Sequence, residues 1–309
     1  MDTTSKFSDF VSAAEIRDLS EPSSIKAAWI LLVNWAIIAG AFAIAVLWPN
    51  PATILASVVI LGGRQLGLAI LMHDCAHYAF FKTKRTNNLI GEWLCAVPTR
   101  ASVYAYRDYH MKHHRHAGTP KDPDRVIVHR YPVESASLKR KILRDLTGRT
   151  GTRALLLRLK SFKVSRDYPW MLFQVALFAV LAAVGAPWAY ALWWAADLFV
   201  LPLLTRIRQI GEHGVARDRD SIDPRENTST TLTSWWERLL IAPNNVAYHL
   251  EHHKCACVPS YNLPKLHRLL KSRGYHDGFD CISSGYVDVL KRAVREPNLS
   301  NPTGDGQRV

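Results

Sequence analysis

The segment from Ala27 to Trp48 is almost entirely apolar and contains no charged residue. At a rise of about 1.5 Å per residue, a helix of this length crosses a hydrocarbon core of about 30 Å. We therefore predict a membrane-spanning helix over residues 27–48. Residues 1–26 are polar and lack the short apolar core and cleavage site of a signal peptide. We expect them to form a cytosolic N-terminal tail.

A second apolar segment, Ala52 to Met72, follows after a very short connection that contains Pro49 and Pro51. Proline ends the first helix there, so we predict a hairpin whose second span covers residues 52–72. Arg64 lies near the middle of this span. Because a charge at membrane depth is costly, we expect Arg64 to face protein or an aqueous cavity rather than lipid.

Two further apolar segments cover residues 169–186 and 188–205 and are joined at Gly185-Ala186-Pro187. Each is near the lower length limit for a span, and Asp197 lies inside the second. We predict a second hairpin. The expected fold class is an all-α integral membrane protein with four transmembrane helices in two hairpins. Its membrane domain covers residues 27–294, and residues 295–309 form a flexible C-terminal tail.

The chain of 309 residues has a formal net charge of +13, which favours an anionic partner such as nucleic acid or a phospholipid surface. Apolar segments alternate with basic ones, and no zinc-finger spacing or RNA-binding signature is present, so we expect a membrane and no nucleic-acid partner. Residues 82–166 are rich in Lys and Arg, which by the positive-inside tendency places them, and both termini, in the cytoplasm. Residues 137–163 are interpreted as basic helix at the membrane surface, with an ordinary solvated helix pair as the alternative.

Histidines recur at helical spacing in three places. On a helix, residues three and four apart share a face, so the imidazoles of each group can point in a common direction. One isolated group could simply be a solvated basic helix, but three are hard to explain in that way. A single histidine, His213, follows the fourth apolar segment as His73 follows the second. The three groups are His73 and His77; His110, His113 and His114; and His249, His252 and His253.

This pattern predicts a metal site. Imidazole suits Zn, Cu, Fe and Ni, and so many rings exceed what one ion can accept, so the ligand count favours two metal ions. A structural zinc would need only a closed tetrahedral set, often with thiolates. The predicted hairpins bring every histidine group to the same side of the membrane. We therefore expect a cytosolic helical cap that carries them.

The sequence around these groups resembles the membrane fatty acid desaturase family, whose members are integral-membrane di-iron proteins with three histidine boxes. The first box continues into Asn87-Asn88-Leu-Ile-Gly91, the second into Asp122-Pro123-Asp124, and the third into Leu263-Pro264-Lys-Leu-His267. The resemblance covers about residues 30–270. It implies two iron ions with O₂ as co-substrate, held by the family's ligand positions: His73, His77, His110, His113, His114, His213, His249, His252 and His253.

Two positions depart from the family pattern. Some members have an asparagine that helps to hold a water on one iron, and here that position is Gln209. The aromatic-proline pair that usually follows the third box is replaced by Lys254-Cys255-Ala256. This second departure would reshape the substrate entrance without touching the metals.

Three acidic residues, Asp74, Glu212 and Glu251, are next to expected ligands and could accept the second imidazole N–H, which would fix the tautomer. Ordinary solvation is the alternative for each. Outside the boxes, His116 is interpreted as an outer neighbour or a surface residue. The remaining histidines, His129, His267 and His276, are interpreted as surface or packing residues.

The resemblance implies an oxygen-dependent desaturase that introduces a double bond into the acyl chain of a lipid. A hydroxylase or ketolase of a lipid or carotenoid, or a desaturase of a specialised metabolite, would use the same scaffold. A non-enzymatic membrane metal carrier would need the histidines but no O₂ chemistry. No fused haem or rubredoxin-like module is evident, so we expect a separate ferredoxin or cytochrome as electron donor, docking at Lys139, Arg140 and Lys141. The expected location is a bacterial inner membrane, with the metal site on the cytoplasmic side.

Overall fold

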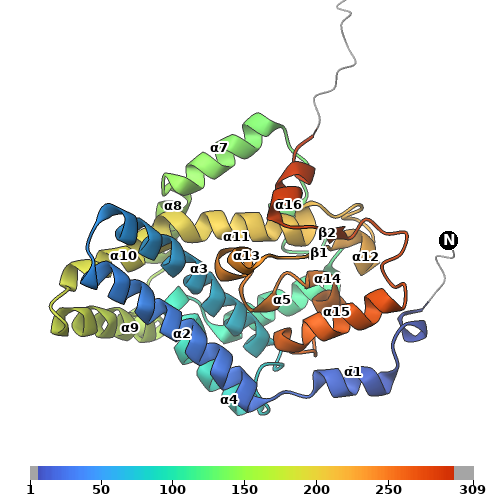
Figure 1. Ribbon diagram of the computed structural model, residues 1–309, viewed down its shortest axis with the longest axis horizontal. Helices are drawn as coiled ribbons and strands as arrows, with labels where there is room; N and C mark the ends of the chain where they lie inside the picture. Colours follow the sequence, from blue (N-terminus) through green and yellow to red (C-terminus); the bar gives the residue numbers. More distant parts are fainter. Residues whose placement is uncertain (1–5, 296–309) are drawn as a thin grey trace, which may run out of the picture.

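The computed structural model describes residues 6–295 and is mostly helical (Figure 1). The predicted C-terminal tail lies outside the described residues except for Arg295. One pair of two-residue parallel strands, β1 and β2, is the exception to the all-α expectation. The elements are α1 Ala13–Ser20, α2 Ser24–Leu47, α3 Pro51–Ala76, α4 Lys84–Ile90, α5 Val103–His116, α6 Arg125–Val128, α7 Ser135–Leu146, α8 Arg149–Lys160, α9 Val164–Ala183, α10 Tyr190–Ala195, α11 Leu201–Gln209, α12 Pro224–Asn227, β1 Thr230–Thr231, α13 Trp235–Leu240, α14 His249–Lys254, α15 Leu263–Ser272, β2 Ile282–Ser283 and α16 Tyr286–Arg292.

The first predicted hairpin is confirmed. Asn50 caps α3 by accepting from the backbone N–H groups of Ala52 and Thr53 at 3.0 and 3.2 Å, and Pro51 occupies the first helical turn, where its missing N–H costs nothing. Helices α2 and α3 lie side by side in Figure 1. Arg64 is buried among protein atoms, as predicted, and donates to the backbone carbonyl of Arg238 at 3.3 Å.

The fourth predicted span lies in one continuous helical run over Pro187–Gly214. This run includes α10, α11 and two π-helical segments, Ala196–Val200 and Ile210–Gly214. The predicted end at residue 205 was therefore too early. Charge misled the prediction, because Arg206 pairs with the buried carboxylate of Asp145 and Arg208 pairs with Glu212. Neutralised in this way, both arginines remain inside the helical run.

Among residues 6–295, three helical runs are long and apolar enough to cross a membrane: Ser24–Leu47, Pro51–Ala76 and Pro187–Gly214. The predicted span 169–186 falls on α9, which ends at Ala183 and is not among these three. Its first turn contains Arg166 and Asp167, which lower its mean hydropathy. Beyond this first turn, the exposed residues of α9 are nevertheless apolar or aromatic, for example Leu172 and Val175.

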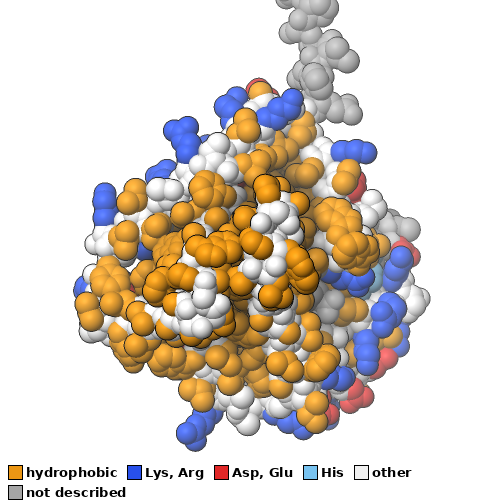
Figure 2. All heavy atoms as spheres, turned by 60° about the vertical axis from the view of Figure 1, so that its left-hand side comes forward, with side chains coloured by type: hydrophobic (Ala, Val, Ile, Leu, Met, Phe, Trp, Pro, Cys, Tyr) orange, Lys and Arg blue, Asp and Glu red, His pale blue; other side chains and the backbone are white. Residues whose placement is uncertain are grey.

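The end of the molecule that carries α9 and α10 presents a broad hydrophobic surface, with Lys and Arg gathered at its margins (Figure 2). Soluble monomers rarely expose so large a contiguous apolar area. The exposed apolar residues include Trp29, Leu47 and Trp48 of the first hairpin and Phe178 and Val180 of α9. Together with the three long apolar helices, this surface identifies a membrane protein.

The N-terminal segment, expected as a tail, folds onto the C-terminal part of the chain from residue 6 onward. The rings of Phe7 and Phe10 pack edge-on against Tyr275 at centroid distances of 5.4 and 5.2 Å. Glu15 of α1 accepts from Arg273 at 2.6 Å. This docking covers α15, which lies beside α14 in Figure 1.

Candidate metal centre

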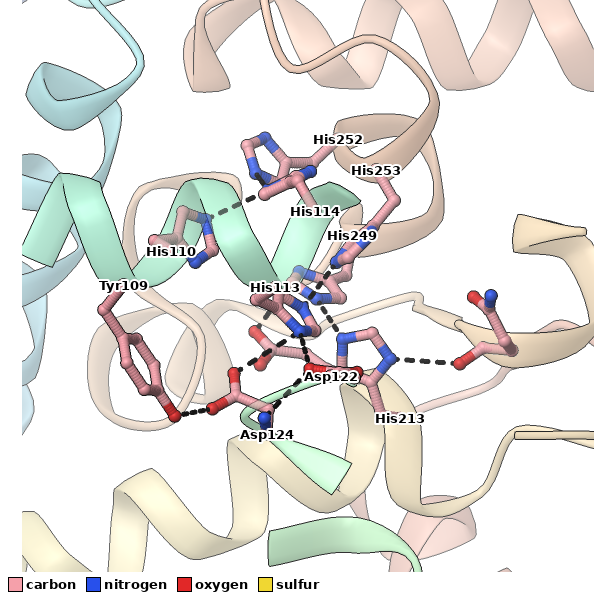
Figure 3. Close-up of polar contacts among 12 residues, drawn as sticks. Tyr109, His110, His113, His114, Asp122, Asp124, His213, His249, His252 and His253 are labelled. Carbon is pink, nitrogen blue, oxygen red and sulfur yellow. Dashed lines mark hydrogen bonds and ion pairs between the residues drawn. The ribbon is translucent and has the colours of Figure 1, made fainter. Parts of the chain in front are cut away.

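Four segments bring all nine predicted histidines together. His73 lies in the last turn of α3, and His77 caps the end of that helix. His213 lies in the π-helical segment Ile210–Gly214, and the others come from α5 and α14. Figure 3 shows the imidazoles of α5, α14 and His213 converging on one region. The histidines divide into two groups, each able to hold a metal ion. The five-histidine group is His73, His77, His110, His114 and His252, and the four-histidine group is His113, His213, His249 and His253.

The spacing within each group fits coordination of a metal ion. One ring nitrogen from every member lies within 4.8 Å of the others. The pairs His110–His114 and His114–His252 bring Nε2 atoms to 3.0 and 3.1 Å. In the other group, His213 and His249 approach to 2.9 Å. Neighbouring ligand atoms around one ion lie about 3.0–3.4 Å apart when the bonds are about 2.1 Å long, so these separations are compatible with coordination.

Helix geometry decides which ring joins which group. On α5, His110 and His114 are four residues apart and join the five-histidine group, whereas His113 turns to the other. On α14 the pair four residues apart, His249 and His253, joins the four-histidine group. The two groups touch where the ring of His253 stacks on His114 at a centroid distance of 4.4 Å. The sequence predicted two metals but left this partition open.

Three histidines have the outer ring nitrogen, Nδ1, fixed by a neighbour. His73 Nδ1 lies 3.0 Å from a carboxylate oxygen of Asp74, and His213 Nδ1 lies 3.0 Å from the backbone carbonyl of Asn227. His113 Nδ1 lies 2.8 Å from Asp122 (Figure 3). An acceptor at Nδ1 places the proton there and leaves Nε2 free to bind a metal. The sequence proposed Asp74 for this role but missed Asp122, although the Asp122-Pro123-Asp124 motif was visible.

Glu212 and Gln209 do not orient a ligand histidine as Asp74 does. Glu212 lies 3.6 Å from His249 Nδ1, beyond a good hydrogen bond, and pairs with Arg208. Gln209 is the half-buried last residue of α11, and within residues 6–295 no hydrogen bond joins its side chain to a histidine of either group.

Glu251 does not contact a histidine of either group through its carboxylate. It accepts from His267 Nδ1 at 2.6 Å, from His276 Nε2 at 3.0 Å and from the hydroxyl of Thr230. The expectation that His267 and His276 are surface or packing residues is therefore incomplete, because both are buried and hydrogen-bonded. Their separation from Glu251 in the sequence concealed the contact. We call these residues the Glu251 cluster.

Burial keeps most of these imidazoles neutral. It lowers the pKa of His77 to about 3, with further lowering by the charge of Arg107, and it lowers the pKa of His114 to about 2. Burial also lowers the pKa of His252 well below its usual value. His113 is different: burial opposes its protonation, but the hydrogen bond to Asp122 raises its pKa overall. A neutral imidazole keeps the lone pair that a metal requires.

Some ring nitrogens in the two groups are buried without a hydrogen-bond partner among the described residues. These atoms are Nε2 of His73, Nε2 of His77 and Nδ1 of His249. A buried polar atom without a partner costs about 1–3 kcal/mol. Metal coordination at Nε2 of His73 and His77 would remove that cost. The residues present therefore fit a pair of metal ions.

The fold and this site define a membrane protein with buried histidine groups that could hold metal ions. The Fatty acid desaturase family model matches residues 47–283, and the chain belongs to that family. It is 26% identical over 291 residues to dihydrorhizobitoxine desaturase from Bradyrhizobium elkanii, which covers 84% of this chain and 80% of the relative.

Other relatives divide between desaturases and ketolases. The chain is 24% identical over 285 residues to an sn-1 oleoyl-lipid 12-desaturase from a Picosynechococcus species, with 82% of this chain and 79% of the relative covered. It is 27% identical over 212 residues to a beta-carotene ketolase from a Paracoccus species, with 65% and 74% covered. Family and relatives together support an oxidoreductase of the desaturase and hydroxylase type.

Proposed function

We propose that the protein is an oxygen-dependent di-iron desaturase that introduces a double bond into the acyl chain of a lipid. The observation that carries this proposal is the pair of adjacent, buried histidine groups. Their nine imidazoles lie at separations that suit metal ligands. Two iron ions in these groups would supply, with O₂ and two external electrons, the oxidising power to remove hydrogens from adjacent carbons.

The chain itself holds and orients the ligands. The five-histidine group would hold one iron and the four-histidine group the other, with Asp74, Asp122 and the Asn227 carbonyl fixing three of the rings. The smaller group supplies fewer protein ligands and so leaves more room for a non-protein ligand.

The membrane arrangement that we propose keeps four spans. Helix α9 joins the three long apolar runs as the remaining span, supported by the apolar surface that it shares with the first hairpin. The metal centre, the helical cap around it and both termini would face the cytoplasm of a bacterial inner membrane, since the basic segment between the hairpins belongs there. Residues 27–294 would form this single membrane domain.

We also propose that a separate ferredoxin or cytochrome delivers the electrons. An acidic carrier would be attracted to exposed cations of α7. Lys139, Arg140 and Arg144 are exposed there, whereas Lys141 lies 4.3 Å above the ring of Tyr131 and is half-buried. We therefore revise the docking site inferred from the sequence: Arg144 takes the place of Lys141, beside Lys139 and Arg140.

Two alternatives come from the relatives. The beta-carotene ketolase supports oxygenation of a carotenoid, and the dihydrorhizobitoxine desaturase supports desaturation of a specialised metabolite. The decisive experiment is expression in a host of known lipid content, followed by mass spectrometry of its lipids. We expect a new double bond that disappears in His113→Ala and His252→Ala. New oxygenated products would favour the ketolase alternative, and full activity in both variants would refute the metal assignment.

A further inference from the structure

One arginine of α5, Arg107, is hydrogen-bonded to the end of α3. The last carbonyl groups of a helix lack a donor within the helix. Arg107 supplies donors to two of them: its Nε donates to the Ala76 carbonyl at 2.7 Å, and its Nη2 donates to the Cys75 carbonyl at 3.2 Å. A cation at the C-terminal end of a helix is also favoured by the helix dipole. These two residues directly precede His77, a member of the five-histidine group.

The same guanidinium group makes two further contacts. Its Nη2 also donates to Oδ1 of Asn88 in α4 at 2.7 Å. Its Cζ lies 4.0 Å from the centre of the Tyr78 ring, a separation that suits a cation–π contact. Tyr78 directly follows His77 and has a φ of 58°, in the left-handed region that a residue with a side chain adopts at a cost. Arg107 therefore contacts the chain on both sides of His77 and stabilises its backbone conformation there.

Arg107 shares a helix face with two histidines of the same group. It lies three residues before His110 and seven before His114, a spacing that places all three on one face of α5. The centroid of the His77 ring lies 4.9 Å from that of His110 and 4.7 Å from that of His114. One side chain thus joins the backbone around His77 to the helix that carries two of its neighbours in the five-histidine group.

The ring of His77 depends on its backbone more than the ring of His73 does. Asp74 accepts from Nδ1 of His73 and so orients that imidazole. Within residues 6–295, Nε2 of His77 is buried without a partner, and no hydrogen bond orients its ring. The backbone at the end of α3 therefore determines where this ring points, and Arg107 holds that backbone.

We infer that Arg107 is a positioning residue for the five-histidine group: by holding the backbone on both sides of His77, it directs Nε2 of that ring towards a metal ion. Arg107 acts through His77 and does not bind the ion itself, because a guanidinium has donors only. The inference rests on the proposed function in one respect, since it takes a metal ion as the occupant of this group. If Arg107 only caps α3, it contributes to stability and not to metal affinity.

Iron binding by the purified full-length protein in detergent tests this inference. Ferrous iron is added without oxygen, in competition with a chelator of known affinity, and the ions retained per chain are counted. Arg107→Gln should weaken the binding of one of the two ions about 10–100-fold, the usual effect of losing a residue that orients a ligand. The other ion should keep its wild-type affinity. At a chelator concentration that leaves two ions in the wild type, this variant should retain one, and its Mössbauer spectrum should show a single ion in place of a coupled pair.

Two further variants separate positioning from capping. Arg107→Lys keeps the positive charge at the helix end but cannot make the forked contact. It should keep the melting temperature of the metal-free protein close to the wild-type value and still weaken the same ion. Arg115→Gln removes an exposed arginine of the same helix and is the matched control for the lost charge, so it should retain both ions. Wild-type affinity for both ions in Arg107→Gln and Arg107→Lys, or equal weakening of both ions, would overturn the inference.

Double variants locate the weakened ion. Arg107→Gln should cause no further loss of iron in a His252→Ala protein, because both changes affect the five-histidine group. In a His249→Ala protein it should remove the ion that remains. The opposite pattern would place Arg107 with the four-histidine group and refute the assignment. Iron binding needs neither O₂ nor a lipid. Two ions with wild-type affinity in the Arg107 variants would therefore refute this inference alone, whereas two bound ions without desaturation would refute the proposed function alone.

Discussion

The two adjoining histidine groups and the Glu251 cluster lie close together in this protein. They differ in what their ring nitrogens face. In the five- and four-histidine groups, imidazole nitrogens face one another at 2.9–3.2 Å. In the Glu251 cluster, two imidazoles instead face one carboxylate, and hydrogen bonds from His267 and His276 overcome the effect of burial to lower the pKa of Glu251 to about 2. The atoms that face one another in the Glu251 cluster are paired by hydrogen bonds, although Nδ1 of His276 is buried without a partner among the described residues. In the two histidine groups, ring nitrogens face ring nitrogens, and an ion would satisfy them.

This difference shows why proximity alone does not identify a metal site. Glu251, His267 and His276 are also near enough to hold an ion. The atoms that face one another there are paired without an ion, because the ionised carboxylate accepts both N–H groups and the Thr230 hydroxyl. We interpret the Glu251 cluster as a support for α14, which carries three of the proposed ligands.

The largest expected contrast comes from removing one imidazole from each cluster. His252→Ala should lose about half of the bound iron or more, because it removes a ligand of the five-histidine group. His276→Ala should keep its iron and lose about 1–3 kcal/mol of unfolding free energy, since it removes a buried hydrogen bond. Elemental analysis and thermal unfolding measure the two effects. If His276→Ala loses iron as completely as His252→Ala, the two clusters do not have separate roles.

A smaller effect is expected at the outer hydrogen bond of His113. Asp122→Asn should weaken iron binding by about 10–100-fold, because the orienting acceptor at Nδ1 loses its charge. Asp124 is the matched control, since its carboxylate lies 3.7 Å from the same nitrogen, and Asp124→Asn should have a smaller effect. Competition with a chelator of known affinity measures both. Equal affinities in Asp122→Asn and wild type would remove Asp122 from the site.

The sequence predicted those parts of the molecule that depend on local pattern. The turn at Pro49-Asn50-Pro51 and the helical spacing of the histidines both depend on residues a few positions apart. The structure added what depends on distant contacts. Asp145 pairs with Arg206 inside a helical run whose end was predicted too early. Glu251 of α14 contacts His267 of the neighbouring helix α15.

A cavity that Tyr106 lines likewise combines α5 with α8 and α9, segments whose approach no local pattern reveals. Helix α9 was predicted as a helix from its local sequence pattern, and the structure has a helix there. Because its first turn is charged, its mean hydropathy is lower than that of the three long apolar runs.

The most direct test of the central claim is the metal content of the purified full-length protein. Inductively coupled plasma mass spectrometry gives the number of ions per chain, and Mössbauer spectroscopy of protein enriched in ⁵⁷Fe shows whether the ions are coupled. The two histidine groups predict two iron ions per chain with the spectrum of a coupled pair. A folded, active protein that contains a single ion, or zinc in place of iron, would contradict this account.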